Sequence, residues 1–153
     1  MNIFEKNSSV RGGGAVALYS NSRDDIPNST QRSHFRNCIF KNNRVDLSSA
    51  QSNSDGYGGA LLISQWATAT IVDCVFDSNR VETKENSFQA GAGGAIYTTD
   101  AFSHTVKPIS RNYVIIDRCI IKNNSVTASL NGYGAGLRIR KPSRITNSLI
   151  INN

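Results

Sequence analysis

The sequence predicts an all-β protein folded as a right-handed parallel β-helix, a solenoid in which the chain winds through stacked rungs. Two short motifs alternate along nearly all of residues 1–153, so that each pair of motifs marks one rung. The runs between them are short and β-prone, and none shows the helical period of about 3.6 residues. We therefore expect a single β-helix segment of about four rungs, with about three short strands in each, that forms part of a longer solenoid.

The first motif is an apolar residue followed three places later by asparagine. Its copies start at Phe4, Phe40, Phe76, Ile121 and Ile150 and end at Asn7, Asn43, Asn79, Asn124 and Asn153. Three copies carry a cysteine two residues before the apolar residue, namely Cys38, Cys74 and Cys119. In stacked rungs the apolar residues and cysteines form inward columns, and asparagine amides hydrogen-bond from rung to rung at a corner. Asparagine also tolerates the left-handed backbone of a tight corner.

The second motif is Gly-Gly-Ala followed by an aliphatic residue. Its glycine pairs are Gly13 and Gly14, Gly58 and Gly59, and Gly93 and Gly94, with a degenerate copy at 134–137 that reads Gly-Ala-Gly-Leu. A glycine pair at the same place in each rung indicates a bend that is too crowded or too strained for a Cβ atom.

Charged residues on the outward face test whether the rungs stack in register. Equivalent residues of adjacent rungs would then lie about 4.8 Å apart. The position after the apolar residue reads Glu5, Lys41, Asp77, Lys122 and Ile151, so charges of opposite sign would be neighbours. Such pairs favour stacking by about 0.2–1 kcal/mol each. One column departs from this rule, because Arg44 would stack on Arg80.

The chain is basic, with a formal net charge of +6, and one basic cluster comprises Arg138, Arg140, Lys141 and Arg144. This cluster is a candidate binding surface, but no aromatic residue is interleaved with it for base stacking, so we expect no specific nucleic-acid partner. Trp66 lies between two expected strands and is a second candidate for binding a sugar or a protein. Both features have structural alternatives, a solvated basic face and a tryptophan that covers the base of a loop.

The odd number of cysteines argues against a complete set of disulfides. We expect buried, reduced thiols, and one rung-to-rung disulfide is the alternative. The sequence contains no Cys-x-x-Cys pair and no histidine at metal-ligand spacing. We therefore expect neither a metal ion nor a cofactor.

Parallel β-helices also serve as polysaccharide lyases and glycosidases, which need paired carboxyl groups or several acidic calcium ligands on one face. The acidic residues of this sequence form no such cluster. Asp73 and Arg118 would meet in one outward column, where an exposed salt bridge is favoured over a catalytic pair. We therefore expect no catalytic residue and no enzymatic activity.

The alternation of Gly-Gly-Ala-[Ile/Leu/Val] with Phe-x-x-Asn resembles the repeat signature of the chlamydial polymorphic outer membrane proteins. The best copies are 58–61, 76–79 and 93–96, and the resemblance extends over residues 4–153. The last two rungs depart from it, with isoleucine for phenylalanine and Gly-Ala-Gly for Gly-Gly-Ala. Proteins of this family are similar to autotransporters, in which a signal peptide and a C-terminal barrel flank a β-helical passenger. The resemblance implies a passenger segment that adheres to host cells.

We therefore expect a non-enzymatic adhesin or structural passenger at the cell surface or outer membrane, or secreted. A carbohydrate-binding or carbohydrate-processing β-helix is the alternative. The expected partners are a host-cell protein or glycan, together with adjoining rungs of a parent chain or further copies of this one. No apolar run in the chain has the length of a signal peptide or of a membrane span, so we expect neither an export signal nor an anchor within it.

Overall fold

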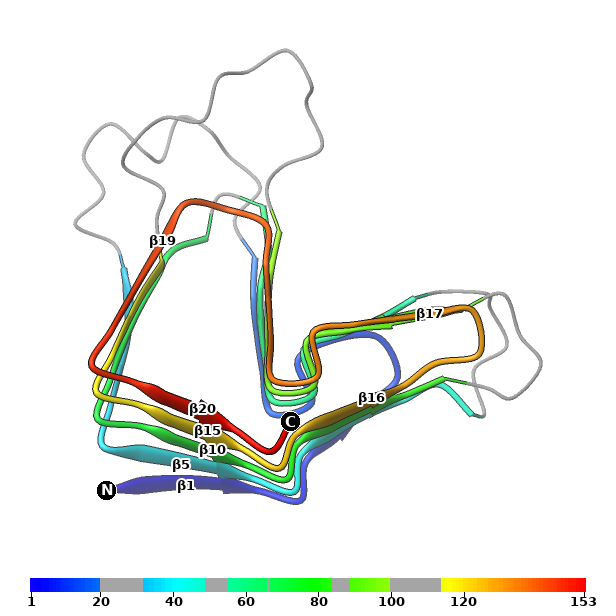
Figure 1. Ribbon diagram of the computed structural model, residues 1–153, viewed down its shortest axis with the longest axis horizontal. Coiled ribbons are helices and arrows are strands. Elements are labelled where there is room, and N and C mark those ends of the chain that lie inside the picture. Colours follow the sequence, from blue (N-terminus) through cyan, green and yellow to red (C-terminus); the bar gives the residue numbers. More distant parts are fainter. Residues whose placement is uncertain (20–31, 49–54, 66, 84–88, 100–113) are drawn as a thin grey trace, which may run out of the picture.

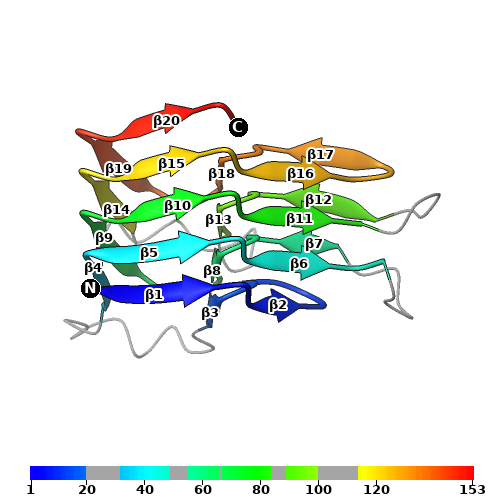
Figure 2. The same ribbon diagram turned by 90° about the horizontal axis from the view of Figure 1, so that it is seen from below.

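The computed structural model describes residues 1–19, 32–48, 55–65, 67–83, 89–99 and 114–153. Within these ranges the chain forms twenty short strands and no helix. The strands make up five parallel sheets, and the chain passes through them in turn (Figure 1). Figures 1 and 2 together show a right-handed solenoid of about four turns, so the fold predicted from the sequence is confirmed.

The five sheets are named A to E in the order in which the chain meets them. Sheet A consists of β1 (Asn2–Glu5), β5 (Cys38–Lys41), β10 (Val75–Asp77), β15 (Ile120–Lys122) and β20 (Leu149–Ile151). Sheet B consists of β2 (Ser8–Ser9), β6 (Arg44–Asp46), β11 (Arg80–Glu82) and β16 (Ser125–Thr127). Sheet C consists of β7 (Gly56–Tyr57), β12 (Ala90–Ala92) and β17 (Asn131–Tyr133). Sheet D consists of β3 (Val16–Leu18), β8 (Leu61–Ile63), β13 (Ile96–Thr98) and β18 (Leu137–Ile139). Sheet E consists of β4 (Ser33–Arg36), β9 (Ala69–Val72), β14 (Val114–Asp117) and β19 (Ser143–Thr146).

A full turn in the described ranges contains five strands instead of the expected three. The additional breaks occur at single residues with left-handed backbone. In the third turn these are Asp73 (φ 54°), Ser78 (φ 57°) and Gly93 (φ 65°), each between two strands. A positive φ turns the chain sharply, so a run that reads as one strand becomes two. At the corner between sheets A and B, the left-handed conformation occurs at the residue before the asparagine of the first motif and not at that asparagine itself. The residues are Lys6, Asn42, Ser78, Asn123 and Asn152.

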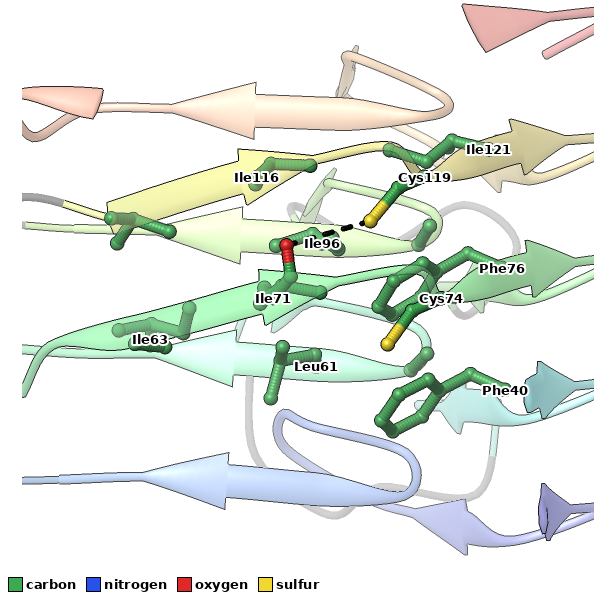
Figure 3. Packing of buried hydrophobic residues seen from close by; sticks show 14 of the residues in the cluster. Phe40, Leu61, Ile63, Ile71, Cys74, Phe76, Ile96, Ile116, Cys119 and Ile121 are labelled. Atoms are coloured by element: carbon green, nitrogen blue, oxygen red, sulfur yellow. Dashed lines mark hydrogen bonds between the residues drawn. The ribbon is translucent and has the colours of Figure 1, made fainter. Parts of the chain in front are cut away.

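The main core lies inside sheets A, D and E, where like residues stack directly on one another (Figure 3). Phe40 is the register partner of Phe4 on one side and of Phe76 on the other. The ring centroids are 4.6 Å apart in both pairs, with interplanar angles of 5° and 1°. Ile121 and Ile150 continue the same column. Stacked aromatic rings of this kind bury a large apolar area in each rung.

Sheets B and C form a side arm that extends away from the main core (Figure 1). Val45, Leu47 and Val81 make up its own small core, with Val126 packed against them. The two sheets approach closely because sheet C places glycines over this core. A Cβ atom at Gly56 would lie only 2.8 Å from Cγ1 of Val81.

An asparagine ladder runs along the corner between sheets A and B. The backbone amide and Nδ2 of Asn79 donate to Oδ1 of Asn124, at 2.9 and 3.0 Å. Nδ2 of Asn79 also donates to the carbonyl oxygen of Phe40 in the preceding rung, at 2.9 Å. The same pattern links Asn7 to Asn43, Asn43 to Asn79 and Asn124 to Asn153. The buried carboxamide of Asn79 therefore has all of its donors and acceptors paired, and the predicted ladder is confirmed.

The second glycine of each pair lies against a carbonyl group of the next rung. A Cβ atom at Gly59 would lie 2.0 Å from the carbonyl oxygen of Gly94 and 2.6 Å from that of Arg80. Gly14 and Gly94 have equivalent surroundings. The crowded bend expected from the sequence is therefore present, and the first glycine of each pair supplies a positive φ.

All three cysteines belong to the described residues, and each is a free, buried thiol. The backbone amide of Cys38 donates to Sγ of Cys74 at 3.4 Å, and this thiol donates to the carbonyl oxygen of Val72 at 3.2 Å. Burial, followed by the neighbouring Cys74, raises the pKa of the Cys38 thiol. The cysteines are buried, as expected, and the structure holds them as free thiols.

Candidate functional site: the elbow between sheets C and D

The outward faces of sheets C and D meet at an inner angle, visible in Figure 1, which we call the elbow. Each strand of sheet C leads into a strand of sheet D through the glycine corner, so outward side chains of both sheets converge there. Sheet C contributes Tyr57, Ala92 and Tyr133, and sheet D contributes Leu62, Tyr97 and Arg138. The elbow therefore gathers aromatic and cationic side chains on the lateral surface of the solenoid.

The centre of the elbow is tightly packed around Tyr57 and Tyr97. Their rings stack with centroids 4.6 Å apart at an interplanar angle of 20°. The hydroxyl of Tyr57 donates to Oδ2 of Asp55 at 2.8 Å, while Oδ1 of Asp55 accepts the backbone amide of Ala90 at 2.8 Å. Burial, followed by the hydrogen bond to Asp55, raises the pKa of the Tyr57 phenol, which therefore stays protonated. Tyr97 is only 4% exposed, so this pair of rings serves packing.

The C-terminal end of the elbow is open to solvent. Tyr133 is 40% exposed, and the guanidinium carbon of Arg138 lies 4.1 Å from the centroid of its ring. Nη1 of Arg140 lies 3.5 Å from the hydroxyl oxygen of Tyr97. The ring quadrupole attracts the guanidinium group and favours its position over the tyrosine ring. This arrangement offers both an apolar plane and charged donors, and tyrosine and arginine are the residue types enriched where proteins contact partners.

The sequence did not identify Tyr133 as part of a binding surface. No aromatic residue is interleaved with the basic cluster in the sequence, so the cluster alone does not point to Tyr133. The sequence does contain a signal that identifies Tyr133 as a neighbour of Arg138. Side chains alternate between inward and outward along the strands on both sides of the glycine corner, and this alternation places Tyr133 and Arg138 on the same outward face.

The basic cluster proposed from the sequence is divided by the structure. Arg138 and Arg140 lie at the elbow. Lys141 is only 3% exposed, and its Nζ donates to the carbonyl oxygens of Gln65 at 2.9 Å and Ala67 at 2.8 Å. These hydrogen bonds therefore link the fourth turn to the segment that follows β8 in the second turn. Arg144 is exposed on sheet E, and Trp66 lies outside the described residues.

Asp73 and Arg118 form an exposed ion pair at the corner between sheets E and A. Nε of Arg118 donates to Oδ1 of Asp73 at 2.7 Å, and Nη2 donates to Oδ2 at 2.9 Å. The hydrogen bonds between the two groups lower the pKa of Asp73 and raise that of Arg118. Both groups therefore stay charged near neutral pH, whereas a general acid or base needs a pKa near the working pH.

The described residues contain no group of three or more His, Cys, Asp or Glu side chains placed to hold a metal ion. They also include no helix with the length and apolarity needed to span a bilayer.

One stretch of the chain, from the end of sheet E through β10, β11, β12 and β13, carries both motifs in their best form. Residues 73–99 match the Chlamydia polymorphic membrane protein repeat. The match contains Phe76 and Asn79 of the first motif and Gly93 and Gly94 of the second, and it confirms the resemblance found in the sequence. No curated protein and no solved structure matches the chain. The repeat is that of a surface protein family, which supports a surface location at this coarse level.

Proposed function

We propose that this chain is a non-enzymatic β-helix segment of a surface protein and that it adheres to a host-cell protein or glycan through its lateral face. The repeat match supports the surface setting. The observation that carries the adhesive role is the open end of the elbow, where the guanidinium group of Arg138 lies over the ring of a partly exposed Tyr133.

The difference in role between inward residues, which pack the core, and outward residues, which face solvent, supports this proposal. Among the described residues, the phenylalanines, cysteines and ladder asparagines of the middle rungs are buried and hold the rungs together. Outward positions such as Tyr133 and Arg138 are free of these packing demands, so they can serve a partner without loss of the fold. A rigid solenoid with a lateral contact surface is the arrangement that repeat proteins use for binding.

An adhesion assay with the intact chain tests the proposal. Beads coated with the chain are expected to bind cultured animal cells, and Tyr133→Ala is expected to reduce this binding severalfold because it removes the exposed aromatic plane. Arg144→Ala is the matched control, since it changes an exposed residue on a different sheet, sheet E. Circular dichroism establishes that each variant is folded.

Two results would overturn the adhesive role. One is the absence of cell binding by the folded wild-type chain. The other is cleavage of oligosaccharides by the chain, monitored by the release of reducing ends, which would favour a carbohydrate-processing β-helix instead.

A further inference from the structure

A hollow of about 310 Å³ lies on the outside of the solenoid, at the step between sheets A and B. Figure 1 shows how the chain steps here from the end of sheet A to the start of sheet B. The hollow is lined by Lys6, Ser8, Asn42, Arg44 and Arg80. All five side chains donate hydrogen bonds, three carry a positive charge and none is acidic. Its volume falls at the lower end of the range for ligand sites, about 300–1,000 Å³.

The repeat itself brings these donors together. Lys6 and Asn42 occupy the left-handed corner before the ladder asparagine in successive rungs, with φ of 56° and 55°. Ser8, Arg44 and Arg80 follow two residues later and are register partners on sheet B. Register partners lie about 4.8 Å apart, so Arg44 and Arg80 place like charges side by side. Such a pair is unfavourable unless an anion lies between or beside the two groups.

Two carboxylates orient the arginines but do not line the hollow. Nη2 of Arg44 lies 3.3 Å from Oδ2 of Asp46, and Nε of Arg80 lies 2.7 Å from Oε1 of Glu82. Both acids stand two residues further along the same strands, away from the corner. The Nε–H of Arg80 is not directed at Glu82, and this buried atom has no hydrogen-bond partner. Because a guanidinium group has five N–H donors, each arginine retains donors for a further acceptor.

We propose that the hollow binds a tetrahedral oxyanion, a sulfate or phosphate group, between Arg44 and Arg80 with Lys6 as the third cation. Guanidinium groups match the geometry of such oxyanions by donating two parallel hydrogen bonds. Ser8 and Asn42 supply neutral donors on the same side. Asp46 and Glu82 already offset part of the repulsion between the stacked arginines, and a bound oxyanion offsets more of it. The net charge of +6 raises the local concentration of anions.

The same oxyanion chemistry occurs in the sulfate esters of polysaccharides and in free inorganic anions. The hollow is at the step between sheets A and B, whereas the elbow is formed by sheets C and D. The anion site is therefore independent of the adhesive role proposed above.

Titration of the ¹⁵N-labelled intact chain tests the site with three probes: inorganic sulfate, a sulfated oligosaccharide and its desulfated counterpart. The Nε–H resonances of Arg44 and Arg80 are expected to shift on addition of inorganic sulfate, while those of Arg118 and Arg138 stay in place. Arg44→Gln and Arg80→Gln are each expected to weaken sulfate binding about tenfold. Arg144→Gln makes the same change of charge on sheet E and is expected to weaken it less than about twofold.

The three probes also distinguish the source of the group. Tighter binding of the sulfated oligosaccharide, abolished by desulfation, identifies a polysaccharide ester, and binding of inorganic sulfate with equal affinity identifies a free anion; both outcomes support the site. The proposal is overturned if neither sulfate-bearing probe shifts the Arg44 and Arg80 resonances. It is also overturned if Arg144→Gln weakens binding as much as Arg80→Gln does. Lys6→Gln, at an exposed corner, provides a second variant if an arginine variant unfolds.

Discussion

Asn43 donates two hydrogen bonds to a single atom of Asn79, its Oδ1, from the backbone amide at 3.0 Å and from the side-chain Nδ2 at 2.9 Å. One carboxamide oxygen thus satisfies two donors of the preceding rung. Because Asn79 repeats this relationship with Asn124, each ladder residue links three consecutive rungs. The register of the solenoid therefore depends on side chains as well as on backbone pairing.

Removal of a central ladder residue is expected to destabilise the solenoid severely. Asn79→Ala leaves the two donors of Asn43 and the carbonyl oxygen of Phe40 without the partners they have in the native chain. Each orphaned buried group costs about 1–3 kcal/mol, so we expect a loss of at least about 3 kcal/mol in the free energy of unfolding. Denaturant titration followed by circular dichroism measures this loss.

The end of the ladder provides the control. Asn7 is exposed and lies in the first described rung. Among the described residues, no donor of an earlier rung therefore loses its partner in Asn7→Ala. Its expected cost is about 0.5–1.5 kcal/mol. Equal losses for the two variants would show that the ladder does not act through shared buried acceptors.

The glycine corner makes a second prediction about stability. Gly59→Ala places a methyl group 2.0 Å from the carbonyl oxygen of Gly94, and backbone on both sides prevents relief. We expect a loss of at least about 3 kcal/mol or failure to fold. Gly132→Ala is the control, because its methyl group would lie 3.4 Å from Val126, an ordinary contact. A thermal melt that falls equally for both variants would contradict the packing explanation.

The architecture was predictable from the sequence because each inward column demands one kind of side chain in every rung. Phe40, Asn79 and Gly59 repeat at equivalent places, and repetition is visible without coordinates. The number of strands per turn was not predictable, because left-handed corners fall on residues as different as Lys6 and Ser78. Asparagine, which tolerates the left-handed conformation, occupies three of the five corners before the ladder (Asn42, Asn123 and Asn152), so residue type gives a signal there but none at Lys6 and Ser78.

The candidate sites were less predictable than the fold, since outward positions are not restricted to one kind of side chain. The cluster around Arg138 looked continuous in the sequence, yet alternation of side chains and a corner direct Lys141 inward and Arg144 onto another sheet. The stacking of Arg44 on Arg80 was visible as an exception to the charge pattern. Only the step between sheets A and B shows that this exception borders a hollow.

Lys141 is expected to contribute to stability and not to binding. Lys141→Met keeps the apolar length of the side chain but removes the donor that serves the carbonyl oxygens of Gln65 and Ala67. An orphaned buried acceptor costs about 1–3 kcal/mol, which denaturant titration resolves. The exposed Arg144 provides the comparison, and Arg144→Met is expected to change stability by less than about 0.5 kcal/mol. A stability unchanged by Lys141→Met would show that the buried ammonium group is dispensable.

The buried thiol of Cys38 predicts a dependence of stability on pH. Burial, followed by the neighbouring Cys74, raises the pKa of the Cys38 thiol above its ordinary value. The folded state therefore favours the protonated thiol, so this contribution is complete below the unfolded pKa of about 8.5 and is lost as the pH rises above it. We expect the contribution of Cys38 to stability to be constant from about pH 6 to 8 and to decline as the pH rises above about 8.5.

Alkylation measures the same property directly. At pH 8 the folded chain is expected to react slowly with iodoacetamide at all three cysteines, and the denatured chain rapidly, as followed by mass spectrometry. Fast modification of Cys38 in the folded chain would contradict the burial described here.

The ends of the described solenoid predict how the isolated chain associates. The last strand exposes Leu149, Ile150 and Ile151 at 50%, 45% and 39%, and such an edge favours stacking of another copy. One feature opposes this stacking. Ala135 occupies the position that is the second glycine of the motif in the other rungs. In the rung below, that position is Gly94, and a Cβ atom there would lie 2.0 Å from the carbonyl oxygen of Ala135. By the same geometry, the methyl group of Ala135 would clash with a backbone carbonyl oxygen of any rung that stacked in register above it.

We therefore expect weak, concentration-dependent self-association that Ala135→Gly strengthens and Ile150→Lys weakens. Sedimentation velocity over a hundredfold range of about 1–100 μM measures both shifts, because association through an edge of this size is expected to be in the micromolar range. If the sedimentation coefficient of Ala135→Gly equals that of the wild type while Ile150→Lys lowers it, the ends associate out of register and the methyl group is irrelevant. If all three chains remain monomeric throughout, the exposed edge of β20 does not recruit another copy.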